Sequence, residues 1–172
     1  MKMLRDENIE ALQQAIALLP RLSTAQFSQK LPACFNASIG GHIRHNIDHY
    51  LSFLGGFPLG RVDYEHRVRN PLIETERDYA VGMLNEICRL LAALPAEDKG
   101  LLVRMETTPD GDSAAWGLST GRRELQFLLS HTIHHYALVA VSCRLQGVEP
   151  HEDFGVAPST LRYRESLKVK VA

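Results

Sequence analysis

The stretch GRRELQFLLSHTIHHYALVAVSCRLQ, residues 121–146, decides the fold. Alternating steps of three and four along it, the spacing of a helix seam in a bundle, connect one set of residues: Leu128, His131, His135, Leu138, Ser142 and Leu145. Other apolar residues cover most of the remaining circumference, and the charged residues lie towards the two ends. The pattern therefore predicts a long, mostly buried helix on which His131 and His135 point inward.

Three further helices are predicted by apolar residues at helical spacing: residues 8–19, 39–54 and 72–94. Ser38 is the expected N-cap of the second of these helices, which ends at the breaker Gly55-Gly56-Phe57-Pro58. Ser119 or Thr120 is expected to cap the helix at 121–146, and Gly147 to end it.

The connections between these helices differ in character. Residues 21–37 are expected to form a connector with one short turn, residues 59–71 a polar loop, and the last 25 residues a mostly irregular tail. Residues 101–118 are typical of a hairpin around a turn at 109–112. The sequence thus predicts an all-α protein, a single domain over residues 1–172. Its expected architecture is a four-helix bundle with a long, hairpin-containing connection between the third and fourth helices.

Composition excludes several classes of protein. Of the 172 residues, 45% are apolar and 23% are charged, which is ordinary for a globular chain, and the net charge is −1. Such a balance lacks the basic excess of nucleic-acid-binding domains, so no direct nucleic-acid contact is expected. The longest apolar runs are far below the ~20 residues of a membrane span, and the N-terminus is unlike a signal peptide. Three scattered cysteines (Cys34, Cys88 and Cys143) suggest reduced thiols, and a cytoplasmic location is expected.

Six of the eight histidines fall in two short windows. In the first window, spacings of three and four place His42, His45 and His49 on one side of the second helix, beside its apolar stripe. This position fits either the edge of a cavity or a solvated face. In the second window, His131 and His135 form an i,i+4 pair on a buried seam, which can hold one metal ion together with an imidazole from a facing helix. Three imidazoles leave a coordination position open for water or substrate.

Other interpretations of single residues stay open. A core histidine is usually satisfied by a carbonyl or carboxylate, and Cys143 lies close enough in sequence to His135 for a Cys–His nucleophile. Asp48 can orient an imidazole, take a proton or pair with Arg44. Candidates for contact with an anionic substrate are cationic or phenolic: Arg44, Arg67, Arg69 and Tyr136. The remaining histidines, in polar loops, are expected at the surface: His66 and His151.

The motifs SIGGHIRH (residues 38–45) and SHTIHH (residues 130–135) resemble those of the DinB/YfiT-like superfamily, and the segment at 154–163 resembles one bacterial subgroup of it. The resemblance implies a four-helix bundle and a divalent metal ion, nickel or zinc, bound by His45, His131 and His135. It also implies that His42, His49 and His134 lie beside the ligands or face the substrate. The known chemistry of the superfamily includes transferases and isomerases that use low-molecular-weight thiols.

Two functions from different classes follow. The first is a metal-dependent enzyme, a thiol-dependent transferase or a hydrolase, in which the ion activates water or a thiol for reaction with a small-molecule substrate. Its candidate catalytic groups are Asp48, His49 and His134. The alternative is a non-catalytic bundle that binds a metal or a small ligand. A homodimer, paired through exposed apolar helix surface, is expected in either case.

Overall fold

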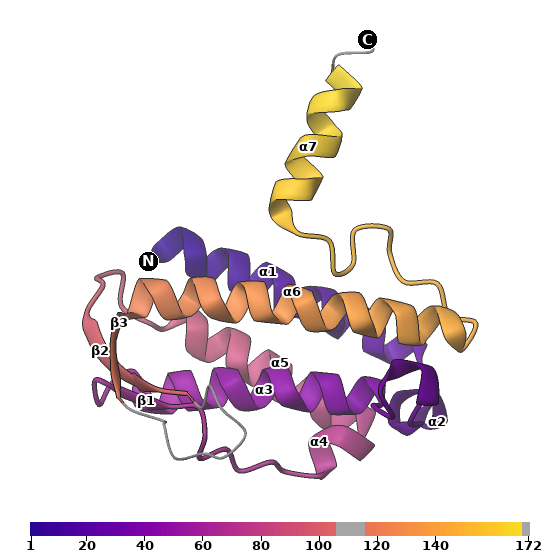
Figure 1. The fold of residues 1–172 in the computed structure, drawn as a ribbon, viewed down its shortest axis with the longest axis horizontal. Coiled ribbons are helices and arrows are strands. Elements are labelled where there is room, and N and C mark those ends of the chain that lie inside the picture. Colours follow the sequence, from indigo (N-terminus) through magenta and orange to yellow (C-terminus); the bar gives the residue numbers. More distant parts are fainter. Residues whose placement is uncertain (106–115, 170–172) are drawn as a thin grey trace.

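Four long helices dominate the structure, a computed structural model that describes residues 1–105 and 116–169 (Figure 1). They are α1 (Lys2–Leu18), α3 (Ile39–Gly56), α5 (Arg77–Ala92) and α6 (Gly121–Leu145). Helix α1 packs against α5 and α6, and α3 packs against the same two helices. The four helices therefore close a ring of contacts around a shared apolar core. The mostly helical character of the chain is as the sequence predicts.

Shorter elements join these helices: 3₁₀ turns at Leu19–Arg21 and Pro32–Cys34, α2 (Thr24–Ser28), α4 (Leu72–Thr75), β1 (Arg61–Asp63), β2 (Gly100–Arg104) and β3 (Gly117–Thr120). The strands form one small sheet in the order β1-β2-β3, with β1 parallel and β3 antiparallel to β2. The buried carboxylate of Glu124 fastens the sheet to α6, because it accepts hydrogen bonds from Tyr64 Oη at 2.8 Å and Ser119 Oγ at 2.5 Å.

The N-termini of the two histidine-bearing helices are capped as the sequence predicts. Ser38 Oγ accepts a hydrogen bond from Gly41 N at 2.9 Å, and Thr120 Oγ1 accepts one from Arg123 N at 3.2 Å. Only glycine fits at position 40, near the start of α3, because a Cβ atom there would lie 2.0 Å from the carbonyl oxygen of Glu74. The missing side chain lets α4 lie directly against the start of α3.

A buried hydrogen-bond network links three of the long helices. Tyr50 Oη donates to Asn8 Oδ1 at 2.7 Å, and Thr132 Oγ1 donates to Tyr50 Oη at 3.2 Å. Asn8 Nδ2 in turn donates to the carbonyl oxygens of Leu4 and Leu125. Because all these polar groups are buried and paired, the network stabilises one arrangement of α1, α3 and α6.

Two of the predicted segments differ from the structure. The helix predicted at 72–94 is divided into α4 and α5 at Glu76, whose backbone is extended (φ −107°, ψ 97°). The break lets α4 bury Ile73 and place the Glu74 carbonyl against Gly40, contacts that apolar spacing does not reveal. The polar loop predicted at 59–71 contains β1, because its backbone pairs with β2 and Val62 is buried.

The expectation of an irregular C-terminal tail is wrong. Pro158 begins a further helix, α7 (Pro158–Val169), which projects away from the other helices in Figure 1. Proline is well tolerated in the first turn of a helix, because its missing N–H would lack an intrahelical partner there anyway. On α7, Tyr163 is 64% exposed and Leu167 is 44% exposed.

Smaller differences concern boundaries and turns. Helix α1 begins at Lys2, six residues before its expected start, and residues 21–37 contain α2 as well as 3₁₀ turns. The predicted hairpin pairing is present between β2 and β3, but its turn at 109–112 lies outside the described residues. None of the described helices combines the length and apolar character needed to cross a bilayer.

Candidate metal centre

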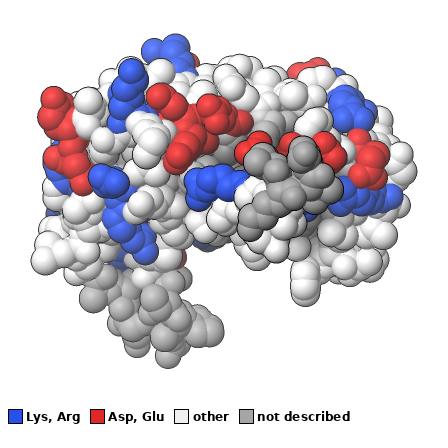
Figure 2. Space-filling view, turned by 90° about the horizontal axis from the view of Figure 1, so that it is seen from above, with Lys and Arg blue, Asp and Glu red and all other residues white. Residues whose placement is uncertain are grey.

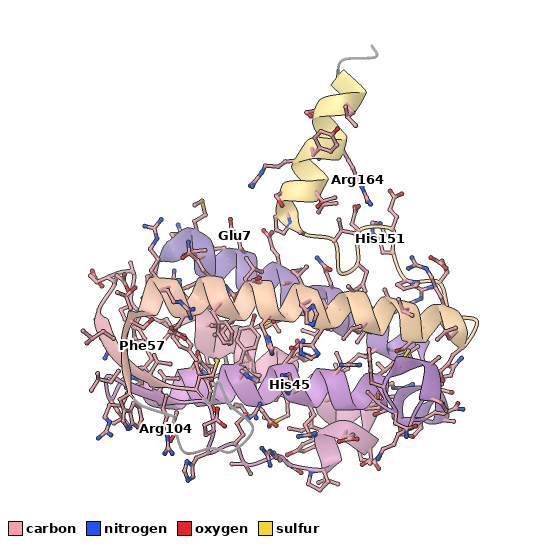
Figure 3. The ribbon with its side chains drawn as sticks, viewed as in Figure 1. Glu7, His45, Phe57, Arg104, His151 and Arg164 are labelled. Atoms are coloured by element: carbon pink, nitrogen blue, oxygen red, sulfur yellow. The ribbon has the colours of Figure 1, made fainter. Side chains whose placement is uncertain are left out.

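Helices α3 and α6 run antiparallel and bring the two histidine windows together. Nε2 of His45 lies 2.9 Å from Nε2 of His131, and Nδ1 of His42 lies 3.0 Å from Nδ1 of His135. The earlier residue of α3 thus faces the later residue of α6. Figure 3 labels His45 on α3, which runs beneath α6 in that view.

Three imidazoles converge between these helices. His45, His131 and His135 each offer a ring nitrogen, and the three atoms lie within 4.8 Å of one another. Burial and, to a smaller extent, the neighbouring imidazoles lower the pKa of His45 to about 2, that of His135 to about 3 and that of His131 to about 4. The three rings are therefore neutral at pH 7, the state in which imidazole binds metals.

The donor set fits a divalent metal ion. Two nitrogens that each lie about 2.05 Å from a common ion are about 2.9 Å apart at a right angle and about 3.3 Å apart at the tetrahedral angle. The separation of 2.9 Å between the Nε2 atoms of His45 and His131 agrees with this range. A hydrogen bond between those two atoms would satisfy only one pair, whereas an ion can satisfy all three imidazoles.

The other histidines of the two windows lie around this group. His42 contacts His135 through Nδ1, as described above, and is buried. His49 is also buried, and its Nδ1–H donates to the carbonyl oxygen of His45 at 2.8 Å, so its Nε2 carries the free lone pair. His134 is exposed, with its ring edge towards His135 at 5.3 Å between centroids. Both windows therefore contribute histidines beside the three candidate ligands.

The carboxylate of Asp48 is held by an arginine. Arg44 Nη1 donates to Asp48 Oδ2 at 3.1 Å, while Arg44 Nε donates to Glu74 Oε2 at 2.9 Å. Burial raises the pKa of Asp48, and the guanidinium of Arg44 opposes this shift. Of the roles left open for Asp48, the structure shows the pairing with Arg44.

The remaining candidates fall into two groups. Arg67 belongs to the first group. Besides burial, its positive charge lowers the pKa of His45, His49 and His131, so it favours the neutral form of these three imidazoles. Tyr136, in contrast, is fully buried and stacks on Phe154 at 4.8 Å, so the expectation that it contacts an anionic substrate is not supported.

Cys143 lacks the surroundings of a reactive thiol. It is fully buried, and burial raises its pKa to about 11. Because the thiolate is the nucleophile, this shift disfavours the alternative of a Cys–His pair.

Two histidines lie outside the cluster, at the surface, as expected. His66 is 78% exposed and donates from Nδ1 to Asp63 Oδ2 at 3.1 Å. His151 is 75% exposed, in the loop that precedes α7.

A cavity of about 280 Å³ adjoins the three-histidine group. Its lining includes His45 and His135 as well as Ser38 and Lys30. Aromatic rings pack on two histidines that do not line this cavity: Phe127 stacks on His131 at 5.3 Å and Tyr64 stacks on His49 at 5.4 Å. Neither ring was predicted to lie at the site, although the spacing of four between Phe127 and His131 was a signal for the first.

The fold and donor set define a mostly helical protein with a candidate three-histidine metal site. Residues 4–139 match the family model of the DinB superfamily, and the chain belongs to this superfamily. The comparison with curated proteins found no match.

Proposed function

We propose that this protein is a divalent-metal-dependent enzyme of the DinB superfamily, in which His45, His131 and His135 hold the ion. The observation that carries the proposal is the convergence of three neutral imidazoles beside a cavity. A purely structural metal site is closed by four protein ligands, whereas three leave room for a reactant. Nickel and zinc are the proposed metals, and the four long helices form the bundle typical of the family.

Each residue at the candidate site has a proposed role in the reaction. The three ligands orient the ion, which when bound supplies a Lewis acid that lowers the pKa of a water molecule or a thiol. The cavity beside His45 and His135 admits the reactant. Among the candidate catalytic groups, His49 is best placed to accept a proton, because its Nδ1–H donates to the carbonyl oxygen of His45 and its Nε2 therefore carries the lone pair. Asp48 is held by Arg44, and His134 is exposed.

We further propose that the reaction is a thiol-dependent transfer or a hydrolysis on a small molecule. The support is membership of the superfamily together with a cavity that is open beside the ligands. The alternative is a non-catalytic protein that binds a metal or a ligand. With cobalt in the site, the enzyme proposal expects the visible absorption to change when low-molecular-weight thiols or substrate analogues are added. An unchanged spectrum throughout such a screen, with no turnover, favours the binding protein.

Metal content tests the site directly. Protein purified without an affinity tag and loaded with Ni²⁺ or Zn²⁺ should contain about one equivalent by elemental analysis. His131→Gln and His135→Gln should lose the metal while the circular dichroism of the helices is kept. His151→Gln, which changes an exposed histidine outside the cluster, is the matched control. Full metal content in both ligand variants would refute the assignment.

We also propose that the chain forms a homodimer. Apolar side chains are exposed on both α6 and α7, among them Val141, Leu145, Tyr163 and Leu167. An isolated helix of 12 residues is marginal in water, so α7 requires a packing partner such as a second copy of the chain. On the face in Figure 2, acidic and basic side chains are intermixed. The absence of a nucleic-acid partner stays a prediction. The cytoplasmic location stays a prediction.

A further inference from the structure

The contact between His42 and His135 joins a residue outside the candidate ligand set to a residue inside it. The two Nδ1 atoms are 3.0 Å apart, across the interface of α3 and α6. His42 is buried, and its Nε2 atom has no hydrogen-bond partner among the described residues. The position of the His42 ring is therefore set by its Nδ1 contact with His135.

The contact constrains the proton of each ring. Two neutral imidazole nitrogens at hydrogen-bond distance need one proton between them, so one Nδ1 donates and the other accepts. If His135 binds an ion, one of its nitrogens must be free of a proton. His42 occupies Nδ1 of His135, which leaves Nε2 for the ion. Consistently, His45 and His131 face each other through Nε2. All three candidate ligands can offer Nε2 to the ion when His135 carries its proton on Nδ1. This Nδ1–H then donates a hydrogen bond to Nδ1 of His42.

We infer that His42 is a positioning residue, which accepts the Nδ1–H of His135 and thereby fixes the tautomer and orientation that present Nε2 to the metal. The inference rests on the proposed function, since it takes His135 as a ligand. Metal-bound histidines generally donate their other N–H to a carboxylate, carbonyl or water, which raises the basicity of the ligand. Here a second imidazole takes that place. Loss of such a partner typically weakens metal binding by about 10–100-fold.

The chain offers a matched set of variants. His42→Leu removes the acceptor and keeps an apolar side chain in a buried position. His42→Gln restores an acceptor, the amide oxygen, at the same position. His134→Leu is the control, because His134 is adjacent to His135 in sequence and space but is exposed and makes no hydrogen bond to it in the described structure.

The first measurement is made on the metal-free protein. Long-range ¹H–¹⁵N NMR spectra at pH 7.5 distinguish the two neutral tautomers of each histidine. We expect His135 to be protonated at Nδ1 in the wild type and in His134→Leu. In His42→Leu we expect a mixture of tautomers, and in His42→Gln a return to the Nδ1–H form. An unchanged His135 spectrum in His42→Leu, or a wild-type His135 protonated at Nε2, would overturn the inference.

The second measurement is metal affinity by competition with a chelator, using Ni²⁺ or Zn²⁺ alone. We expect a loss of about 10–100-fold in His42→Leu, substantial recovery in His42→Gln and wild-type affinity in His134→Leu. Equal affinity in His42→Leu and wild type would contradict the inference, and so would X-ray absorption spectra that show one fewer nitrogen ligand in His42→Leu, since His42 would then be a ligand itself. The tautomer spectra separate the two proposals: metal binding that is absent from the wild type refutes the proposed function, while the spectra still decide the His42 contact.

Discussion

Lowering the pH should destabilise the metal-free protein at pH values well above those at which carboxylates titrate. The cause is the group formed by His45, His131 and His135, whose pKa values burial lowers to about 2, 4 and 3. In the unfolded chain a histidine has its ordinary pKa of about 6.5. As the pH falls below that value, the unfolded chain binds protons that the folded protein does not. Stability from these groups is therefore fully present above pH 6.5 and is lost progressively as the pH falls towards the lowered values.

The magnitude follows from the size of the shift. Between pH 7 and pH 5, a histidine whose folded pKa lies below 4.5 loses about 2 kcal/mol of folding stability. The loss for the cluster is at least that of one member, which lowers the midpoint of thermal unfolding by about 4–8 °C in a domain of this size. The raised pKa of Asp48 acts in the opposite direction. For this reason the informative comparison is between the wild type and histidine variants rather than the absolute loss.

The assay is thermal unfolding followed by circular dichroism, in a chelator, at pH 7 and pH 5. The double variant His45→Gln/His131→Gln should show a smaller difference between the two pH values than the wild type. His66→Gln, which changes an exposed histidine, should keep the full difference. A wild-type midpoint that does not fall between pH 7 and pH 5, or a double variant with an undiminished difference, would refute the reasoning.

Three further outcomes are expected. Because burial raises the pKa of Cys143 to about 11, iodoacetamide at pH 8 should modify the partly exposed Cys88 well before Cys143, as mapped by peptide mass; rapid labelling of Cys143 would restore the Cys–His alternative. Tyr50→Phe should lower the free energy of unfolding by about 1–3 kcal/mol in denaturant titrations, because it deprives the buried amide oxygen of Asn8 of its donor; a loss below 0.5 kcal/mol, within the ~0.5 kcal/mol range of a neutral surface change, would contradict this. Deletion of residues 158–172 should convert a dimer into a monomer in light scattering, and a monomeric wild type would refute the homodimer.

The parts of the fold that sequence predicted are those set by local periodicity and capping. The seam of residues 121–146, Ser38 and the breaker after α3 act over a few residues, so their consequences are visible in the sequence. The break at Glu76 and strand β1 depend on partners far along the chain, the backbone around Gly40 and strand β2. Such contacts override local preference and leave no periodic signal.

The candidate site was likewise predictable from the sequence only in part. The i,i+4 pair His131 and His135 follows from the geometry of one helix, and the resemblance to a known family selected His45 from its window. The role of His42 could not be derived, because it depends on which nitrogen of a neighbouring ring it meets. Hydrogen bonds of that kind are set by side-chain rotamers at a helix interface, which spacing along the sequence does not determine.

The third candidate ligand, His45, depends on how two helices pack, so the candidate metal centre depends on the packing of the core. His131 and His135 keep their spacing as long as α6 is helical, but His45 meets them only while α3 keeps its position along α6. Thr132, the residue after His131, donates to Tyr50 on α3, and both side chains are buried. This hydrogen bond opposes sliding of α3 along α6. Substitution of Tyr50 should therefore weaken metal binding as well as stability, although Tyr50 contacts none of the three imidazoles through a hydrogen bond in the described structure.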